Sequence, residues 1–216
     1  AHHIIYLDGH GNQGLSVAYN AAALHCRTLN SGGILCIFDD DTEITDAYFD
    51  CLKKVAERGE MAIFVPLLKA AGKLISPSLL KPNFHCELFQ SKEQAMTYTG
   101  KRLTALNSGM AVDLKIFADY RYDERLFLDG IDHKFMKDMA TRGIPVKVMN
   151  CVLEHHLSAY ERPSLDSAIH RYNIFKNDVK VFAGSRYKRI LLRRTIKLSL
   201  QYKTCAFLKA CRRSEI

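Results

Sequence analysis

The sequence has no hydrophobic run long enough to span a membrane. Every apolar stretch falls short of the roughly 18 uninterrupted residues that a transmembrane helix requires. The first residues also lack the charged and then apolar pattern of a secretion signal. These absences argue against a transmembrane or secreted protein and predict a cytoplasmic one.

Cysteine spacing likewise lacks the patterns of disulfide or zinc chemistry. The seven cysteines are an odd number, contain no CxxC pair and stand mostly within apolar stretches. Such cysteines are typical of reduced structural thiols. With 48% hydrophobic and 25% charged residues, and without repeats or low-complexity segments, the 216 residues predict one globular domain with a sizeable core.

The positive charge is concentrated at the C-terminal end. The chain has a formal net charge of +8, and residues 184–216 contain ten Lys or Arg side chains against Glu215 alone. Residues 1–183 therefore carry a net charge of −1. We divide the chain accordingly into a domain of residues 1–183 and a basic, amphipathic helical tail of residues 184–216.

Three interpretations of this tail remain open. Its Ile, Leu and Phe residues alternate with cations, as in a helix that lies on an anionic membrane. A terminal helix that packs on the domain and exposes a charged face would show the same pattern. The third interpretation is a surface that binds nucleic acid. It is the weakest, since the sequence has neither zinc-finger spacing nor an aromatic RNA-binding signature. We predict no nucleic-acid partner, and a protein that can lie peripherally on the inner face of the cell membrane.

Strand-like and helix-like stretches alternate along the first domain, which predicts an α/β fold whose sheet has a parallel core. The polar region from 69 to 101 predicts loops with short strands. The predicted strands cover residues 3–8, 34–38, 61–68 and 144–156, and residues 103–113 predict a strand and a turn. The predicted helices cover residues 15–29, 45–59 and 127–143.

Asp39, Asp40 and Asp41 directly follow the predicted strand at 34–38. In open α/β sheets, ligands bind beyond the carboxyl ends of the strands. Three adjacent carboxylates repel one another, and a divalent cation such as Mg²⁺ or Mn²⁺ is the usual compensation. The alternative is a solvated turn whose aspartates cap the next helix near Thr45.

The stretch GNQGLSVAYN, with Asn12, Gly14 and Asn20, places a glycine turn immediately before a helix. Free backbone N–H groups at the start of that helix could bind a phosphate. The alternative is a simple connection, in which Gly14 supplies a turn conformation and Asn12 a local hydrogen bond.

Two further segments carry candidate catalytic groups. Asp129 and Asp132 are three residues apart in an apolar setting, so they share a helix face and either could act as a general base. Acidic residues also simply favour the first turn of a helix. His155, at the end of the last predicted strand, could complete the aspartate metal site or be an ordinary polar side chain with a partner.

These motifs together resemble a known family. The segments NQGLSVAYNAA, IFDDDTEI, NSGMAV, YDERLFLDGIDHKF and VLEHHLS resemble, in this order, the motifs of inverting family 2 glycosyltransferases with the GT-A fold. The rhamnosyltransferase-like branch, which builds cell-surface polysaccharide, is the most similar, and HRYNIFKN at 170–177 also resembles it. The resemblance covers roughly residues 4–180. It implies an α/β, GT-A-like mixed sheet flanked by helices.

The resemblance also implies a reaction and its residues. The reaction is transfer of a sugar, rhamnose in this branch, from a dTDP- or UDP-sugar to a hydroxyl of a polysaccharide or lipid-linked acceptor. Asp39, Asp41 and His155 would bind the cation, with Asp39 also oriented toward the nucleotide sugar. Asp132 would be the base. The remaining assignments are Asp129, which would orient acceptor or base, and Ser108 and Gly109, which would lie near the donor sugar.

The sequence departs from the family pattern at two places. Asp138 and Lys134 stand where the family commonly has Arg and an acid, which suggests an ion pair with exchanged signs. The family also opens with a first strand, a helix and a second strand, whereas this sequence starts near the third strand. We therefore expect an N-terminally truncated fold with an incomplete nucleotide pocket.

Two other functions fit the same residues. Three aspartates, a histidine and a phosphate-facing helix would also serve a metal-dependent nucleotidyl or phosphoryl transferase. A catalytically impaired subunit that docks on a membrane through its basic tail is a non-enzymatic alternative.

Overall fold

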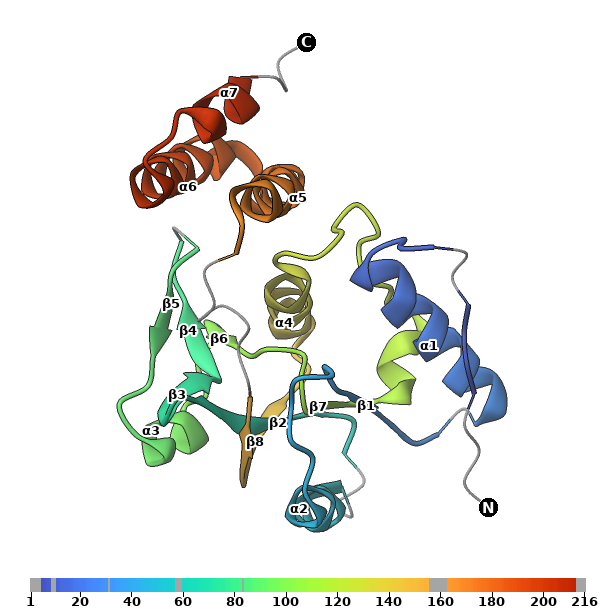
Figure 1. Ribbon diagram of the computed structural model, residues 1–216. Coiled ribbons are helices and arrows are strands. Elements are labelled where there is room, and N and C mark those ends of the chain that lie inside the picture. The colour runs from blue at the N-terminus through green and yellow to red at the C-terminus, as the bar shows by residue number, and fades with distance from the viewer. Residues whose placement is uncertain are drawn as a thin grey trace.

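The computed structural model describes residues 5–8, 11–30, 32–56, 60–82, 84–155 and 163–212. A central sheet has the order β1-β7-β2-β3, with β8 beside β2 (Figure 1). Its strands are β1 (Ile34–Ile37), β2 (Ile63–Ala70), β3 (Lys73–Ser76), β7 (Met110–Asp113) and β8 (Val146–Glu154). A small antiparallel sheet stands beside it, made of β4 (Ser78–Leu80), β5 (Cys86–Leu88) and β6 (Leu103–Thr104).

The central sheet is mixed rather than parallel at its core. Strands β2 and β8 are the one parallel pair among the described strands, and β1–β7, β7–β2 and β2–β3 are antiparallel. The expected parallel core is therefore wrong. Parallel neighbours need a long crossover, whereas β2 turns directly into β3 at Ala71 and Gly72. The predicted strand at 3–8 is also wrong for residues 5–8, which form no strand and leave Tyr6 88% exposed. Residues 3 and 4 lie outside the described residues.

Helices cover both faces of the central sheet. Helix α2 (Asp46–Ala56) packs on one face, and α1 (Leu15–Leu29), the 3₁₀ turn η1 (Leu114–Ala118) and α4 (Ile131–Arg142) pack on the other (Figure 1). A short helix, α3 (Lys92–Thr97), precedes β6. The predicted helix at 15–29 is confirmed, and the helix predicted at 127–143 starts four residues later, at Ile131, and ends as predicted before Gly143, whose φ is 72°.

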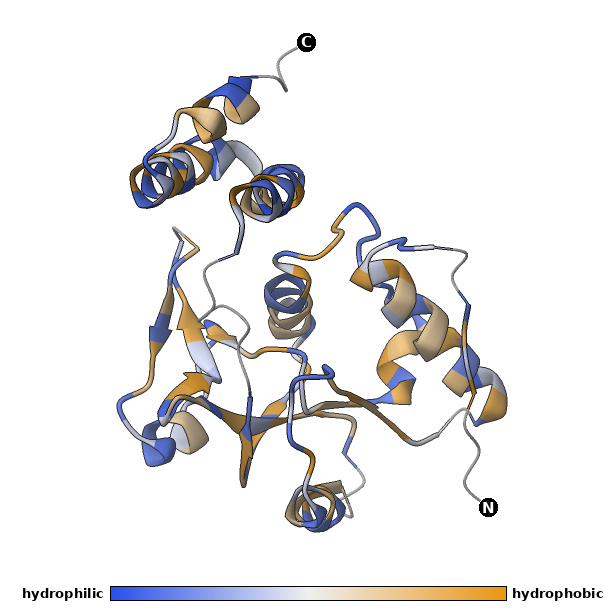
Figure 2. Ribbon diagram, viewed as in Figure 1, coloured by the Kyte–Doolittle hydropathy of each residue, from blue (hydrophilic) through white to orange (hydrophobic). Residues whose placement is uncertain are grey.

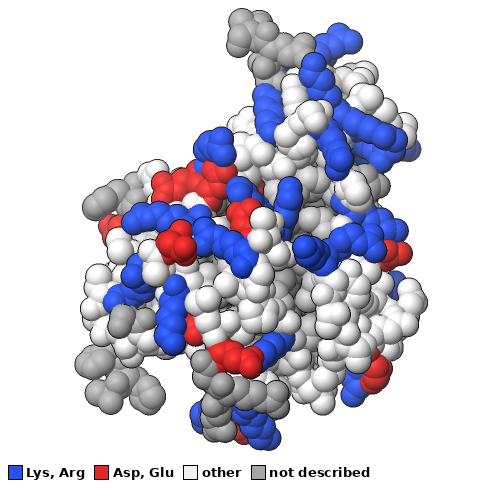
Figure 3. All heavy atoms as spheres, turned by 180° about the vertical axis from the view of Figure 1, so that it is seen from behind, with Lys and Arg blue, Asp and Glu red and all other residues white. Residues whose placement is uncertain are grey.

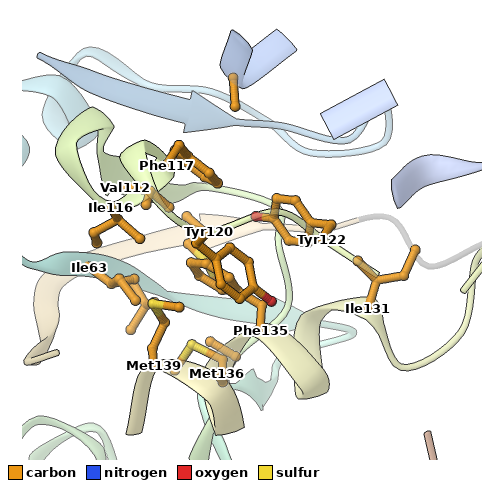
Figure 4. Close-up of a cluster of buried hydrophobic side chains, with 14 of the residues drawn as sticks. Ile63, Val112, Ile116, Phe117, Tyr120, Tyr122, Ile131, Phe135, Met136 and Met139 are labelled. Carbon is orange, nitrogen blue, oxygen red and sulfur yellow. The ribbon is translucent and has the colours of Figure 1, made fainter. Parts of the chain in front are cut away.

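The core follows the alternation of side chains along β2. Ile63 packs with Phe135 and Met139 of α4, whereas Phe64, its neighbour, packs on the opposite face with Tyr48 of α2. Figure 4 shows the first of these clusters, in which aromatic rings from the segment after β7 meet α4. In Figure 2 the central strands are correspondingly hydrophobic. This packing fixes the start of α4 relative to the strand ends.

The C-terminal helices pack mainly on one another. They are α5 (Leu165–Ala183), the 3₁₀ turn η3 (Gly184–Arg186), α6 (Tyr187–Tyr202) and α7 (Ala206–Arg212). Tyr172, Leu191 and Phe207, one from each helix, form the centre of their shared hydrophobic cluster. Among the described helices, none is both long and apolar enough to traverse a bilayer. The division of the chain at residue 183 stays a prediction.

Candidate active site

Asp39, Asp41 and His155 come together at one end of the central sheet. The two aspartates lie in the turn after β1, and His155 directly follows β8. An antiparallel bridge between Thr42 and His155 joins the turn to β8. One potential ligand atom from each of the three side chains lies within 4.8 Å of the other two. Two strands thus bring the predicted metal ligands to one point.

Hydroxyl groups hold this turn in place. Ser108 is fully buried, and its Oγ accepts a hydrogen bond from the backbone N–H of Asp39 at 3.1 Å. Thr42 Oγ1 lies 2.6 Å from Ser108 Oγ and 2.7 Å from His155 Nδ1. The backbone N–H of Gly109 donates to the last carbonyl of β1 at 2.7 Å. Ser108 and Gly109 therefore adjoin the aspartate turn.

The chemistry of the cluster suits a divalent cation. Asp41 Oδ1 is buried and accepts no hydrogen bond from the described residues, although it lies 3.2 Å from His155 Nδ1. Burial and the Asp41 carboxylate raise the pKa of Asp39, and His155 opposes this shift. A buried, unsatisfied polar group costs about 1 to 3 kcal/mol. A cation bound by two carboxylates and an imidazole would satisfy Asp41 and offset the repulsion between the acids.

Asp132 lies near this cluster, in the first turn of α4. Its charge helps to raise the pKa of Asp39, and also that of Tyr19, which burial raises to about 12. Asp132 Oδ1 accepts a hydrogen bond from the backbone N–H of His133 at 2.7 Å. The side chain is 16% exposed. Asp132 is thus held in place but remains accessible to a substrate.

His133 is a cationic partner for Asp132. Burial opposes its protonation, but the Asp132 carboxylate and the Cys86 thiol raise the pKa of His133 to about 9. Its Nδ1 lies 3.6 Å from Asp132 Oδ1 and 2.7 Å from Thr104 Oγ1. The Asp132 carboxylate thus favours the protonated form of this ring, which carries a positive charge at the start of α4.

Helix α5 clamps the segment that precedes α4. Arg171 donates hydrogen bonds to both carboxylate oxygens of Asp129, with Nη2 2.6 Å from Oδ1. Asp178 is 1% exposed, and its carboxylate accepts the backbone N–H groups of Phe127, Leu128 and Asp129 at 2.9, 2.9 and 2.7 Å. The Asp129 carboxylate is thus engaged by α5, and the orienting role predicted for it stays a prediction.

Replacement of Asp178 by Ala should destabilise the fold, because three partly buried backbone N–H groups would lose their acceptor. We expect the free energy of unfolding to fall by about 3 kcal/mol or more. Urea unfolding followed by circular dichroism would measure this loss. Asp50→Ala, which removes an acid 67% exposed on α2, is the matched control and should change stability by less than about 0.5 kcal/mol. Equal stabilities for the two variants would contradict the clamp.

The glycine turn at the start of α1 packs against the segment before α4. Asn12 Oδ1 accepts the backbone N–H of Gly14 at 3.1 Å. Gly14 has a φ of +90°, and a Cβ there would lie 2.8 Å from Phe127. Buried Asn20 bonds both the carbonyl and the N–H of Tyr122. These contacts confirm the turn interpretation of Gly14 and Asn12, and phosphate binding by Asn12, Gly14 and Asn20 stays a prediction.

The ion pair with exchanged signs is confirmed. Lys134 Nζ donates to Asp138 Oδ2 at 2.7 Å, one helical turn apart on α4. Tyr120 also donates its hydroxyl to Asp138 Oδ2, at 3.1 Å. The pair fixes the exposed side of α4.

Sequence reasoning missed three residues that position the site, Thr42, Arg171 and Asp178. Arg171 and Asp178 are seven residues apart, so they lie on one face of α5. A cation and an acid on the same helix face are a pattern that can be recognised in the sequence. Their partners, more than forty residues earlier, carry no such signal. Thr42 has no pattern that distinguishes it from an ordinary turn residue.

Comparisons with known proteins support the fold. No protein-family model and no curated protein sequence matches the chain. The crystal structure of GalNAc-T7 with UDP, GalNAc and Mn²⁺ is similar, with a TM-score of 0.54 and 17% sequence identity. The similarity covers 94% of this chain and 41% of that chain, so this chain spans less than half the length of that structure. The predicted GT-A-like fold, a mixed sheet flanked by helices, is confirmed.

Proposed function

We propose that this protein is a metal-dependent, inverting glycosyltransferase of family 2. The observation that carries the proposal is the meeting of Asp39, Asp41 and His155 on a GT-A-like fold, with Asp132 close by. The similar GalNAc-T7 structure contains UDP and Mn²⁺, which supports a nucleotide-sugar donor and a divalent cation here, Mg²⁺ or Mn²⁺. The sequence motifs favour the rhamnosyltransferase-like branch, with a dTDP- or UDP-sugar as donor and a polysaccharide or lipid-linked acceptor.

The site residues divide the work between leaving group and acceptor. A cation held by Asp39, Asp41 and His155 would neutralise charge on the departing nucleoside diphosphate. Ser108 and Thr42 keep those ligands in position. Asp132 would accept the proton of the acceptor hydroxyl as that oxygen bonds to the anomeric carbon from the face opposite the diphosphate. One such displacement inverts the anomeric configuration.

Isothermal titration of the purified chain with UDP and with dTDP tests this function. We expect binding of at least one nucleotide in Mn²⁺ and none in chelator. Binding that is equal in Mn²⁺ and chelator would contradict the metal site. Turnover of the nucleotide without any sugar acceptor would favour a nucleotidyl or phosphoryl transferase instead.

The exposed face of α6 supports contact with an anionic membrane. Leu192, Ile196 and Leu200 are 54%, 47% and 73% exposed and lie at four-residue intervals, so they form one apolar stripe. Exposed Arg189 and Arg193 lie beside it. Figure 3 shows Lys and Arg gathered over the C-terminal helices at the upper right. An apolar stripe bordered by cations matches the surface of an anionic bilayer, and we infer that the protein docks there peripherally, on the inner face of the membrane.

Replacing Leu192, Ile196 and Leu200 together by Ser should weaken vesicle binding about ten-fold or more, because each side chain loses burial in the bilayer. Cosedimentation with phosphatidylglycerol vesicles at low salt would measure this, and high salt should weaken wild-type binding as well. Leu24→Ser with Leu29→Ser, on exposed positions of α1, is the control. Unchanged binding of the triple variant would rule out this face.

A further inference from the structure

A cavity of about 290 Å³ lies between the β4–β5 hairpin, α4 and the end of α5. Among the described residues that line it, none is acidic. Its apolar lining residues include Leu80, Pro82, Phe84 and Phe182. The lining also contains a set of cations: Lys81, Lys101, Arg102, Lys137 and Arg186. The cavity therefore offers both an apolar wall and an excess of positive charge.

The hairpin tip is fixed against α5. Phe84 adopts a φ of +66°, and its ring meets the Phe182 ring edge-on with centroids 3.9 Å apart. The turn is closed by a hydrogen bond of 3.0 Å from the N–H of Phe84 to the carbonyl of Lys81. Phe182 in turn covers Gly130, where a Cβ would approach its ring to 3.3 Å. The apolar wall thus joins hairpin, α5 and the start of α4, and Figure 1 shows the hairpin directed toward the C-terminal helices.

The positive charge of the cavity is mostly uncompensated. Lys81 pairs with Glu87 at 3.2 Å. Lys101, Arg102, Lys137 and Arg186 form no ion pair with any residue in the described part of the chain. Like charges around one hollow repel one another and attract an anion. His133, which also lines the cavity, adds its own positive charge when protonated.

The cavity adjoins the proposed base but not the metal ligands. His133 follows Asp132 in sequence and contacts it, whereas Asp39, Asp41 and His155 are absent from the lining. An anion bound here therefore differs from the donor diphosphate assigned to the metal site.

We propose that this cavity binds the phosphate of an amphiphilic acceptor, in which a phosphate or diphosphate group joins an apolar chain to the part that carries the reacting hydroxyl. The cations would hold the phosphate, and Phe84 and Phe182 would contact the start of the chain. The claim that the ligand is the acceptor rests on the proposed function. The claim that the cavity binds an amphiphilic phosphate rests on the cavity alone.

Titration with farnesyl diphosphate in chelator tests the site without the metal. We expect binding that is tighter than that of inorganic pyrophosphate, which lacks the chain, and of farnesol, which lacks the charge. The double variant Arg102→Gln with Lys137→Gln should lower the affinity for farnesyl diphosphate about ten-fold or more, since both exposed cations are lost. Lys53→Gln with Lys54→Gln, an equal charge change on exposed positions of α2, should leave it unchanged.

The outcomes separate this inference from the proposed function. The variant Asp41→Asn should still bind farnesyl diphosphate like the wild type. Loss of nucleotide binding by this variant would therefore leave the test of the cavity unaffected. Equal weakening by both double variants would show attraction by net charge only and would overturn the site. Farnesol binding as tight as that of farnesyl diphosphate, or pyrophosphate binding as tight, would overturn the amphiphilic phosphate.

Discussion

Asp41→Asn is expected to remove cation-dependent nucleotide binding. Asp41 supplies a buried carboxylate oxygen that accepts no hydrogen bond from the described residues, and it lies beside His155. An amide at this position would offer the cation a neutral oxygen and would turn N–H donors toward the other ligands. Mutation of residues that merely support metal ligands lowers metal affinity about 10- to 100-fold. Because Asp41 is itself a proposed ligand, we expect cation-dependent nucleotide affinity to fall about 100-fold or more.

Titration with the nucleotide that the wild type binds in Mn²⁺ would measure this loss. Asp40→Asn is the matched control, since Asp40 is exposed and lies outside the ligand cluster. Both variants lose one negative charge from the same turn. If Asp41→Asn kept wild-type affinity in Mn²⁺, or if Asp40→Asn lost as much, the ligand assignment would be wrong.

Asp132→Asn should remove transfer and spare binding. Asn has nearly the same shape and can still accept the hydrogen bond from the backbone N–H of His133. It cannot take up the proton of an acceptor hydroxyl. General bases typically contribute about 10²- to 10⁴-fold to the rate, so kcat should fall by that factor.

Turnover with the sugar donor that the wild type uses, together with nucleotide titration, would separate the two effects. Asp123→Asn is a suitable control, because this acid comes from the same acidic segment but pairs with exposed Arg125. We expect the control to keep its activity and both variants to bind nucleotide like the wild type. Wild-type turnover by Asp132→Asn would exclude Asp132 as the base.

Local patterns in the sequence predict much of this fold. The helix at 15–29 is long and has a clear apolar face, and Gly143 ends α4 in a left-handed conformation that favours glycine. The stretch at 3–8 has the composition of a strand, but residues 5–8 pair with no strand in the described chain. A strand is stable only through a neighbour, and a single sequence does not say which neighbours are present.

The site is predictable where chemistry limits the choice of residue. Adjacent aspartates after a strand and a histidine after another indicate a metal, and the structure brings these three together. The positioning roles of Arg171 and Asp178 could not be predicted from residue type, because their partners are an acid and backbone groups far away in the sequence. Such contacts depend on how α5 lies across the molecule, which helix periodicity does not specify.

The grip of α5 on the segment before α4 has a consequence for motion. Surface segments that carry site residues usually open on their own, and their amide hydrogens exchange quickly with solvent. Here the N–H groups of Phe127, Leu128 and Asp129 are all bonded to one buried carboxylate on a 19-residue helix. Their protection against hydrogen exchange is therefore set by α5. We therefore expect the stretch that leads to Asp132 to open together with α5 rather than on its own.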